Sequence, residues 1–476
     1  MLKFTIKEII EALKDNFKGD INLYKDNFNH EIKLLSTDSR EAASNETCFI
    51  ALKGKRADDQ EVNAHRFVEG ALNNGSYAIV SEDFPNLSED KQKQLIRVKD
   101  TIDAFGQIGN LHRQQFKGKL IGITGSSGKT STKDMLKTIL LSFGKTYATP
   151  KNLNSQLGVP QCLIDMTKEN YDYAIIEMGM SGIGEMKKLT SYTQPDIAIA
   201  INVYPMHLEF FKSIKSIAAE KASIFEGLKD NGIAIYNADS QCADILSEGA
   251  QEHNNFKSYG RKGSDISLIS EEDTILTIKT SSNETISYEI PENNLAFKYN
   301  SMSTMCICQA LGLPLKEISK KYKEIRSSDG RGKIKNFTIN ETKNIKIIDE
   351  SYGGGHAEAM IIGLTRLQNK ASKGRKIAII GNMAELGIAT EEEHKKVGQF
   401  INTMKLDKII LIGENTKIIQ NELDKNKTDI TTFYDKIDEL LPNIENNLQN
   451  NDLVFIKGAH YSSQVWKIID KFETTK

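Results

Sequence analysis

The sequence predicts an α/β protein with three domains. These are a small N-terminal α/β domain (residues 1–100), a central P-loop domain with a doubly wound, mostly parallel sheet (residues 101–328), and a Rossmann-like C-terminal α/β domain (residues 329–476). The chain has 476 residues, which is too many for one ordinary hydrophobic core. Short apolar runs alternate with stretches of helical spacing, as is typical of parallel sheets covered by helices. A polar, glycine-bearing stretch at Ser327–Gly332 indicates a linker before the last domain.

The N-terminal domain shows this alternation on a small scale. Helical spacing occurs at Phe4–Leu13 and Phe67–Asn74, and apolar strand patterns occur at Thr47–Gly54 and Tyr77–Val80. The polar cluster Asp38–Arg40 follows an apolar pair. On the residues alone, this cluster is as well explained by an ordinary turn as by a ligand contact.

The central domain contains the pattern around which the chain is organised. The apolar run Leu120–Thr124 predicts a buried strand, a glycine-serine turn follows, and Lys133–Leu141 has helical spacing. Backbone N–H groups in such a loop and the start of the helix both attract phosphate oxygens. Lys129 is expected against the β- and γ-phosphates of ATP, and the Thr130 hydroxyl on Mg²⁺. The expected ATP-binding residues of this loop are Thr124, Gly125, Ser126, Ser127, Gly128, Lys129, Thr130 and Ser131.

The loop has a T-G-x-x-G-K-T spacing, which is shorter than the usual phosphate-loop pattern, so a chance Lys-Thr after a glycine turn is the alternative. The strand before it and the helix after it argue against that alternative. Three further apolar runs predict parallel strands, and ligands of such sheets gather at the strands' carboxyl ends. The three apolar runs end at Glu177, Asn202 and Asn237. After them, a β-period alternation over residues 265–290 predicts an attached antiparallel meander.

Four apolar runs predict the strands of the C-terminal domain, with helices between them at roughly thirty to forty residues' spacing. No G-x-G-x-x-G motif is present, so dinucleotide binding is not supported. The four runs are Ile345–Ile348, Ile377–Gly381, Lys408–Gly413 and Leu453–Gly458.

Composition excludes several classes of function. The formal net charge of −2 gives no basic field of the kind that a nucleic-acid-binding protein needs. Five scattered cysteines without zinc-pair spacing indicate reduced thiols. The N-terminus carries charges too often for a signal peptide, and no apolar stretch approaches the ~18 residues of a membrane span. We therefore expect a cytoplasmic protein with no membrane or nucleic-acid partner.

Metal-dependent phosphoryl transfer needs oxygen ligands near the phosphate loop, and Glu177 closes the strand that follows the loop's helix. A solvated carboxylate at a strand end is the alternative for Glu177. On the residues alone, His207 is more often structural and Lys221 more often a solvated helix charge.

Several of these stretches together resemble the Mur ligases, the ATP-dependent enzymes that add amino acids in peptidoglycan synthesis. The resemblance covers nearly the whole chain. It is closest to the branch that joins D-alanyl-D-alanine to UDP-N-acetylmuramoyl-tripeptide. Its most specific signals are the asparagine pair in Asn152–Pro160 and the Met-x-Glu-Leu-Gly run in Gly381–Gly387, where Asn382 replaces an aspartate. The other matching stretches are Ser36–Arg40, Phe49–Gly54, Thr124–Thr130, Glu177–Gly179 and Gly184–Glu185.

The resemblance implies ATP and Mg²⁺ as cofactors and an acyl-phosphate mechanism. The first Mg²⁺ would be held at Thr130. A second would be ligated by Glu177, His207 and a carbamylated Lys221, because carbamylation gives a lysine an anionic oxygen. Lys129, His207 and Lys221 would be the catalytic residues.

The resemblance also implies how the substrates are held. Ser39 and Arg40 would lie near the uridine diphosphate, and Asn152 and Asn154 would contact the same substrate. Asn300 would lie near the adenine. In the third domain, Arg331 and Asp349, and with less support Tyr352, would reach ATP on domain closure. The chain is expected to act as a monomer.

The chain departs from the family in two places. The family's asparagine- and proline-bearing loop is replaced by Gly353-Gly354-Gly355-His356, and His460 stands where arginine is frequent. Three alternatives remain: the ligase that adds the third residue, folylpolyglutamate synthase, and a nucleotide-binding relative without catalysis. The first lacks support because no D-N-P-R motif is present, and Asp38–Arg40 speaks against the second.

Overall fold

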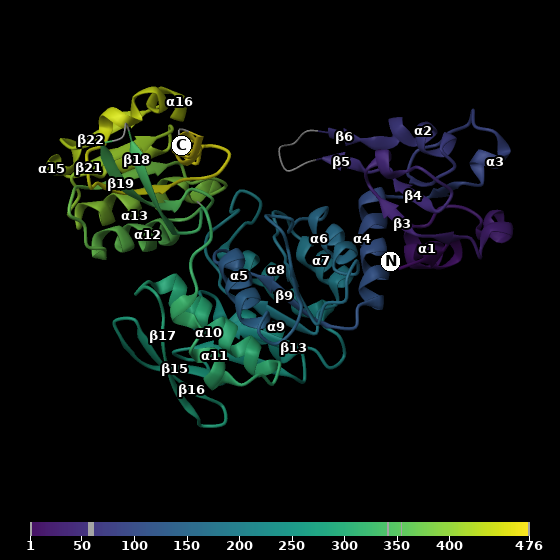
Figure 1. Ribbon diagram of the computed structural model, residues 1–476, viewed down its shortest axis with the longest axis horizontal. Helices are drawn as coiled ribbons and strands as arrows, with labels where there is room; N and C mark the ends of the chain where they lie inside the picture. Colours follow the sequence, from purple (N-terminus) through teal and green to yellow (C-terminus); the bar gives the residue numbers. More distant parts are fainter. Residues whose placement is uncertain (1, 56–60, 340–341, 354, 475–476) are drawn as a thin grey trace.

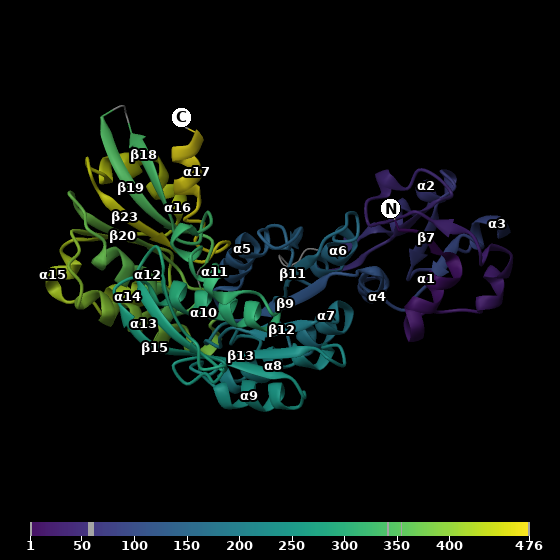
Figure 2. The same cartoon turned by 60° about the horizontal axis from the view of Figure 1, so that its bottom comes forward.

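The computed structural model describes residues 2–55, 61–339, 342–353 and 355–474 and arranges them as three α/β domains. Figure 1 shows the N-terminal domain (purple) and the C-terminal domain (green to yellow) at opposite ends of the long axis, with the central domain between them. Figure 2 shows the same order after a turn of 60°. None of the helices within these described ranges combines the length and apolar character that a membrane crossing requires.

Helix α1 (Ile6–Leu13) begins at a reciprocal cap. The Glu8 N–H donates to Thr5 Oγ1 at 3.2 Å, and the Thr5 N–H donates to the Glu8 carboxylate at 2.7 Å. This arrangement satisfies two N–H groups that the first helical turn leaves without partners. The apolar residues of the helix recur at helical spacing and face the core of the N-terminal domain.

A four-stranded parallel sheet of order β3-β4-β7-β8 forms the centre of the N-terminal domain. Two short antiparallel pairs, β1 with β2 and β5 with β6, lie beside it. The bounds are β1 (Phe4–Thr5), β2 (Glu31–Ile32), β3 (Leu34–Ser36), β4 (Thr47–Ile50), β5 (Lys53–Lys55), β6 (Glu61–Asn63), β7 (Tyr77–Val80), β8 (Leu95–Arg97), α2 (Val68–Asn73) and α3 (Glu89–Gln92).

Helix α4 (Thr101–Gln115) packs against two domains at once. Phe105 and Ile108 are buried in the N-terminal core. On another face, Gly106 lies so close to the central domain that an added Cβ would be 2.1 Å from the Tyr192 ring. The helix therefore fixes the N-terminal domain against the central one.

The central domain contains a nine-stranded sheet of order β10-β11-β9-β12-β13-β14-β15-β16-β17. The strands from β10 to β15 pair in parallel, and β15 to β17 form the antiparallel meander. The strands are β9 (Lys119–Thr124), β10 (Thr146–Ala148), β11 (Tyr173–Glu177), β12 (Ile197–Ala200), β13 (Ile233–Asn237), β14 (Phe256–Gly260), β15 (Ile266–Glu272), β16 (Ile275–Thr280) and β17 (Thr285–Glu289).

Separate hydrophobic clusters cover the two faces of this sheet, because neighbouring residues of a strand point to opposite sides. Leu120 joins one cluster, and Ile121 joins the other. Strands β11, β9 and β12 are parallel neighbours, so their carboxyl ends lie side by side. The order in which the chain adds strands to the sheet switches from one side of β9 to the other at this point. The helices are α5 (Lys129–Leu140), α6 (Gly158–Asp165), α7 (Glu185–Thr193), α8 (Ile214–Ala222), α9 (Ala243–Gln251), α10 (Leu295–Ala310) and α11 (Leu315–Ser319).

The C-terminal domain has a six-stranded sheet of order β18-β19-β23-β20-β21-β22, in which only the β18–β19 pair is antiparallel. Its strands are β18 (Lys333–Ile339), β19 (Lys343–Glu350), β20 (Lys376–Gly381), β21 (Lys408–Ile412), β22 (Thr431–Tyr434) and β23 (Leu453–Lys457). Its helices are α12 (Ala357–Asn369), α13 (Thr390–Asn402), α14 (Thr416–Asn421), α15 (Lys425–Thr428), α16 (Ile437–Leu440) and α17 (Lys467–Thr474).

Candidate active site at the phosphate loop

The glycine loop joins the end of β9 to the start of α5, as its sequence predicts. Gly128 occupies the residue before the helix with a φ of 83°, a left-handed conformation that glycine adopts without strain. A Cβ at this position would also lie 2.9 Å from Asn300 Oδ1 on α10. Asn300, the expected adenine neighbour, therefore lies directly against the loop.

The loop is held in shape by residues that follow β12. Asn202 accepts from the N–H groups of Ser126 (3.1 Å, to its backbone oxygen) and Ser127 (2.9 Å, to its side-chain oxygen). Its side-chain amide donates to the Ser127 carbonyl at 2.8 Å. The Tyr204 N–H donates to Ser126 Oγ at 2.9 Å. The sequence pattern marks Asn202 only as a strand end, because its role depends on β9 and β12 being neighbours in the sheet.

Glu177 lies at the centre of the polar groups around the loop. Its carboxylate accepts hydrogen bonds from the Thr130 hydroxyl (3.0 Å) and from the Asn154 side-chain amide (2.8 Å). The Lys129 ammonium donates to the Gly125 carbonyl at 2.7 Å. Burial lowers the pKa of Lys129; the Glu177 carboxylate opposes this shift, and the Arg331 guanidinium adds to it. Oxygen donors and a lysine are thus gathered at the carboxyl ends of β9 and β11.

Lys221 lies on α8 with its side chain buried, and no described carboxylate forms an ion pair with its ammonium. Burial lowers the pKa of Lys221 far below its usual value, and the nearby Lys129 charge lowers it further. His207 follows β12 and has a left-handed φ of 58°. Its imidazole Nδ1 contacts the carboxylate of Glu385 in the C-terminal domain, and this contact lowers the pKa of Glu385.

A cavity of about 630 Å³ opens between the central and C-terminal domains. The expected site residues that line it come from both domains. The structure brings most, but not all, of the expected set together here. The described residues of the wall do not include Lys221, Thr124, Gly125, Asn152 and Asp349. The expected residues in the wall are Ser126, Ser127, Gly128, Lys129, Thr130, Ser131, Asn154, Glu177, His207, Asn300, Arg331 and Tyr352.

Arg331 extends from the linker into this cavity. Burial lowers the pKa of its guanidinium, and the Glu177 carboxylate opposes this fall more strongly than the other nearby charges do. Asp349 lies beneath the same turn: its carboxylate accepts from the Gly330 N–H at 3.1 Å and from the Ser351 hydroxyl at 2.6 Å. Asp349 therefore shapes the turn that carries Arg331, and its expected contact with ATP stays a prediction.

The altered glycine loop contributes His356, whose position in the sequence indicates only a departure from the family pattern. Its ring stacks on Tyr204 with centroids 4.5 Å apart, and burial lowers the pKa of His356. His460 also lines the cavity and packs against Tyr352, with centroids 4.4 Å apart. Gly354 lies outside the described residues.

The expected contacts to the UDP-linked substrate lie in two places. Ser39 and Arg40 form a short 3₁₀ turn (Ser39–Glu41) in the N-terminal domain, where the exposed Arg40 side chain pairs with Asp38 and holds the pKa of that carboxyl at about 2. Asn152 is exposed on the loop before α6, whereas Asn154 reaches Glu177. The N-terminal turn is therefore separate from the cavity wall.

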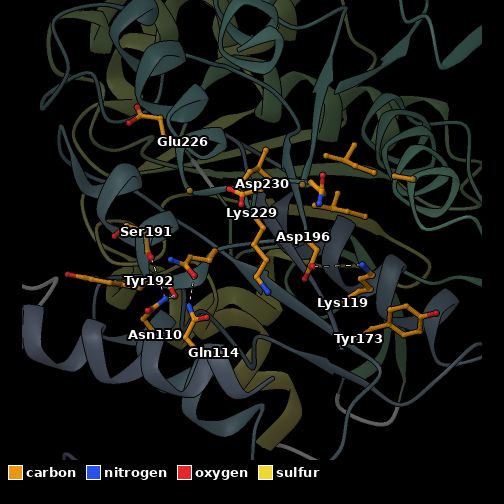
Figure 3. Close-up of a pocket in the computed structure, with 18 of the residues that line it drawn as sticks. Asn110, Gln114, Lys119, Tyr173, Ser191, Tyr192, Asp196, Glu226, Lys229 and Asp230 are labelled. Atoms are coloured by element: carbon orange, nitrogen blue, oxygen red, sulfur yellow. Dashed lines mark hydrogen bonds and ion pairs between the residues drawn. The ribbon is translucent and has the colours of Figure 1, made fainter. Parts of the chain in front are cut away.

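A second cavity, of about 1200 Å³, lies at the amino ends of the central strands, and Figure 3 shows side chains that line it. Its wall includes Lys119, Tyr173 and Ile197, the first residues of β9, β11 and β12. Asp196 in this wall is already paired, with Arg113 at 2.9 Å and Lys119 at 3.9 Å. Ligands of parallel sheets bind at the carboxyl ends of the strands, so the phosphate-loop cavity is the candidate active site.

Comparison with known proteins agrees with this geometry. Residues 123–308 match the Mur ligase middle domain, and residues 337–460 match the Mur ligase, glutamate ligase domain. The chain is 30% identical to the UDP-N-acetylmuramoyl-tripeptide--D-alanyl-D-alanine ligase of Haemophilus influenzae, over 96% of this chain and 95% of that one. It is 31% identical to the protein of the same name from Escherichia coli, over 88% of each chain.

A crystal structure of MurF from Acinetobacter baumannii superposes on the chain with a TM-score of 0.82 at 26% identity, covering 99% of both chains. The chain belongs to the Mur ligase family. The expected family and fold class are thereby confirmed.

Proposed function

We propose that the chain is an ATP-dependent, ADP-forming ligase that joins D-alanyl-D-alanine to UDP-N-acetylmuramoyl-tripeptide in cytoplasmic peptidoglycan precursor synthesis. The observation that carries this proposal is the cavity in which the phosphate loop, Glu177 and the C-terminal Arg331 meet. The names of the relatives that match nearly the whole chain support the choice of substrates.

The chemistry follows from charge. A peptide carboxylate is a poor electrophile, so it first attacks the γ-phosphate of ATP and becomes an acyl phosphate, with ADP leaving. The amine of the dipeptide then attacks the acyl carbon, and inorganic phosphate leaves. Lys129 would stabilise the charge that builds on the transferring phosphoryl group. The C-terminal domain forms part of the cavity wall, and its closer approach would protect the acyl phosphate from water.

The residues around the loop fit a hard cation. Thr130 and Glu177 supply adjacent oxygens, and His207 lines the same cavity. Lys221 is buried and forms no ion pair with a described carboxylate, and its lowered pKa favours the neutral amine, which is the form that reacts with carbon dioxide to give a carbamate. Mg²⁺ held by these groups would neutralise the phosphate oxygens.

The test is phosphate release from ATP with purified full-length protein, together with mass spectrometry of the product. We expect release only when UDP-N-acetylmuramoyl-tripeptide and D-alanyl-D-alanine are both present, and a product that carries two more alanines. Release with a single amino acid and the shorter UDP-dipeptide would instead indicate the ligase that adds the third residue. No release with any pair would indicate a relative without catalysis.

A further inference from the structure

The Met-Ala-Glu-Leu-Gly turn after β20 is a specific sequence signal for which the proposed function gives no role. In the structure, this turn reaches out of the C-terminal domain and docks on the turn after β12 in the central domain. The Glu385 carboxylate contacts His207 Nδ1, and the Glu209 N–H donates to the Glu385 carbonyl at 3.4 Å. Side chain and backbone therefore join the two domains at one point.

The backbones of both turns are specially shaped for this contact. His207 and Glu385 have left-handed φ values of 58° and 60°, which cost a non-glycine residue about 1 kcal/mol or more each. Gly387 has a φ of 51°, and a Cβ there would lie 2.9 Å from the Glu209 Cα. His207 and Glu385 therefore adopt unfavourable backbone conformations where they touch, and the close approach requires glycine at position 387. We take this combination as a sign that the contact between the two domains is specific.

The contact also settles which imidazole nitrogen remains available. Because Nδ1 faces Glu385, Nε2 is the nitrogen left for a ligand, and His207 lines the cavity that contains Glu177. A carboxylate on the far nitrogen fixes the ring orientation and raises the basicity of a metal-binding histidine. The feature thus combines a ligand residue from one domain with its orienting carboxylate from another.

We propose that Glu385 is a positioning residue: it orients His207 toward the divalent cation and makes the cation site complete only when the C-terminal domain is docked. This inference rests on the proposed function, because it takes His207 to be a ligand. It gives the Met383–Gly387 turn a mechanical role, which is to couple domain arrangement to cation affinity.

The test measures binding of Mn²⁺, a paramagnetic substitute for Mg²⁺, to the full-length protein with ADP by electron paramagnetic resonance. The variants are Glu385→Gln, which keeps size and removes charge, His207→Ala, and the double variant. The matched control is Glu391→Gln on α13, an exposed glutamate paired with Lys395 at 2.6 Å. Thermal unfolding and ADP affinity without metal are measured for each variant.

We expect Glu385→Gln to weaken Mn²⁺ binding about 10- to 100-fold, with unchanged unfolding temperature and unchanged metal-free ADP affinity. His207→Ala should weaken Mn²⁺ binding at least as much as Glu385→Gln does. The double variant should bind Mn²⁺ as tightly as His207→Ala alone, because Glu385 acts through His207. The control should match the wild type.

Wild-type Mn²⁺ affinity in Glu385→Gln, with His207→Ala weakened, would overturn the inference and leave the proposed function standing. Additive losses in the double variant would also overturn it, since Glu385 would then act independently of His207. Unchanged affinity in both single variants would refute the assignment of His207 as a ligand.

Discussion

Glu177→Gln separates the charge of the candidate site from its shape. The carboxylate accepts two hydrogen bonds, from the Thr130 hydroxyl and the Asn154 amide. A glutamine can keep both contacts, because the Thr130 oxygen can accept from the new amide while Asn154 donates to the remaining oxygen. We therefore expect the free energy of unfolding to change by less than about 1 kcal/mol.

The loss of charge has a much larger effect on turnover. Two unit charges 4 Å apart interact by about 4 kcal/mol at an effective dielectric constant near 20. In Glu177→Gln, the attraction between residue 177 and a cation bound there during phosphoryl transfer thus weakens by on the order of 3–4 kcal/mol. A transition state destabilised by this amount corresponds to a fall in turnover of about 10²- to 10³-fold.

The assay is phosphate release at saturating ATP and substrates, with thermal unfolding measured in parallel. Glu226→Gln is the control, because Glu226 is exposed and pairs with Lys187 at 2.8 Å, away from the phosphate loop. Turnover of Glu177→Gln within about threefold of the wild type would show that the Glu177 charge does not stabilise the transition state by about 3–4 kcal/mol, and would refute this role.

Three further predictions concern single residues. Lys129→Ala should abolish acyl-phosphate formation, measured as phosphate release, and a retained rate would contradict the phosphate-loop assignment. Lys221→Ala should abolish turnover and be partly rescued by short carboxylic acids that replace the carbamate oxygens; near-normal activity without them would count against that role. Burial lowers the pKa of His112 from 6.5 to about 4, so the unfolded chain binds a proton that the folded chain excludes. The free energy of unfolding should therefore fall by up to about 3 kcal/mol as pH drops through that window. His112→Asn, which keeps a donor toward Thr167, should lose this dependence in urea unfolding at several pH values, and an unchanged slope would disprove it.

The sequence was sufficient for the parts of the fold that are coded locally. The strand before Gly125 and the helix after it lie where the apolar run and the helical spacing place them. Edge strands were harder: β22 (Thr431–Tyr434) and the half-exposed β18 carry few apolar residues in an unbroken run, so they gave no clear pattern.

Within the candidate site, residues on the loop could be predicted, whereas those that depend on domain contacts could not. Thr130 and Glu177 are close because β9 and β11 are neighbours, which the strand-end rule anticipates. The contact of Glu385 with His207 and the stacking of His356 on Tyr204 bring together segments far apart in sequence, and no periodicity records such distances. Residue roles taken only from the family resemblance stay predictions.

The position of α4 has a consequence for dissecting the molecule. Phe105 and Ile108 complete the apolar interior of the first hundred residues, although they come after them in the chain. A fragment that stops at residue 100 would lose these two side chains and forfeit roughly 3–6 kcal/mol of burial. The N-terminal domain is thus not an independent unit, because the helix that completes its interior also packs against the central domain through Gly106.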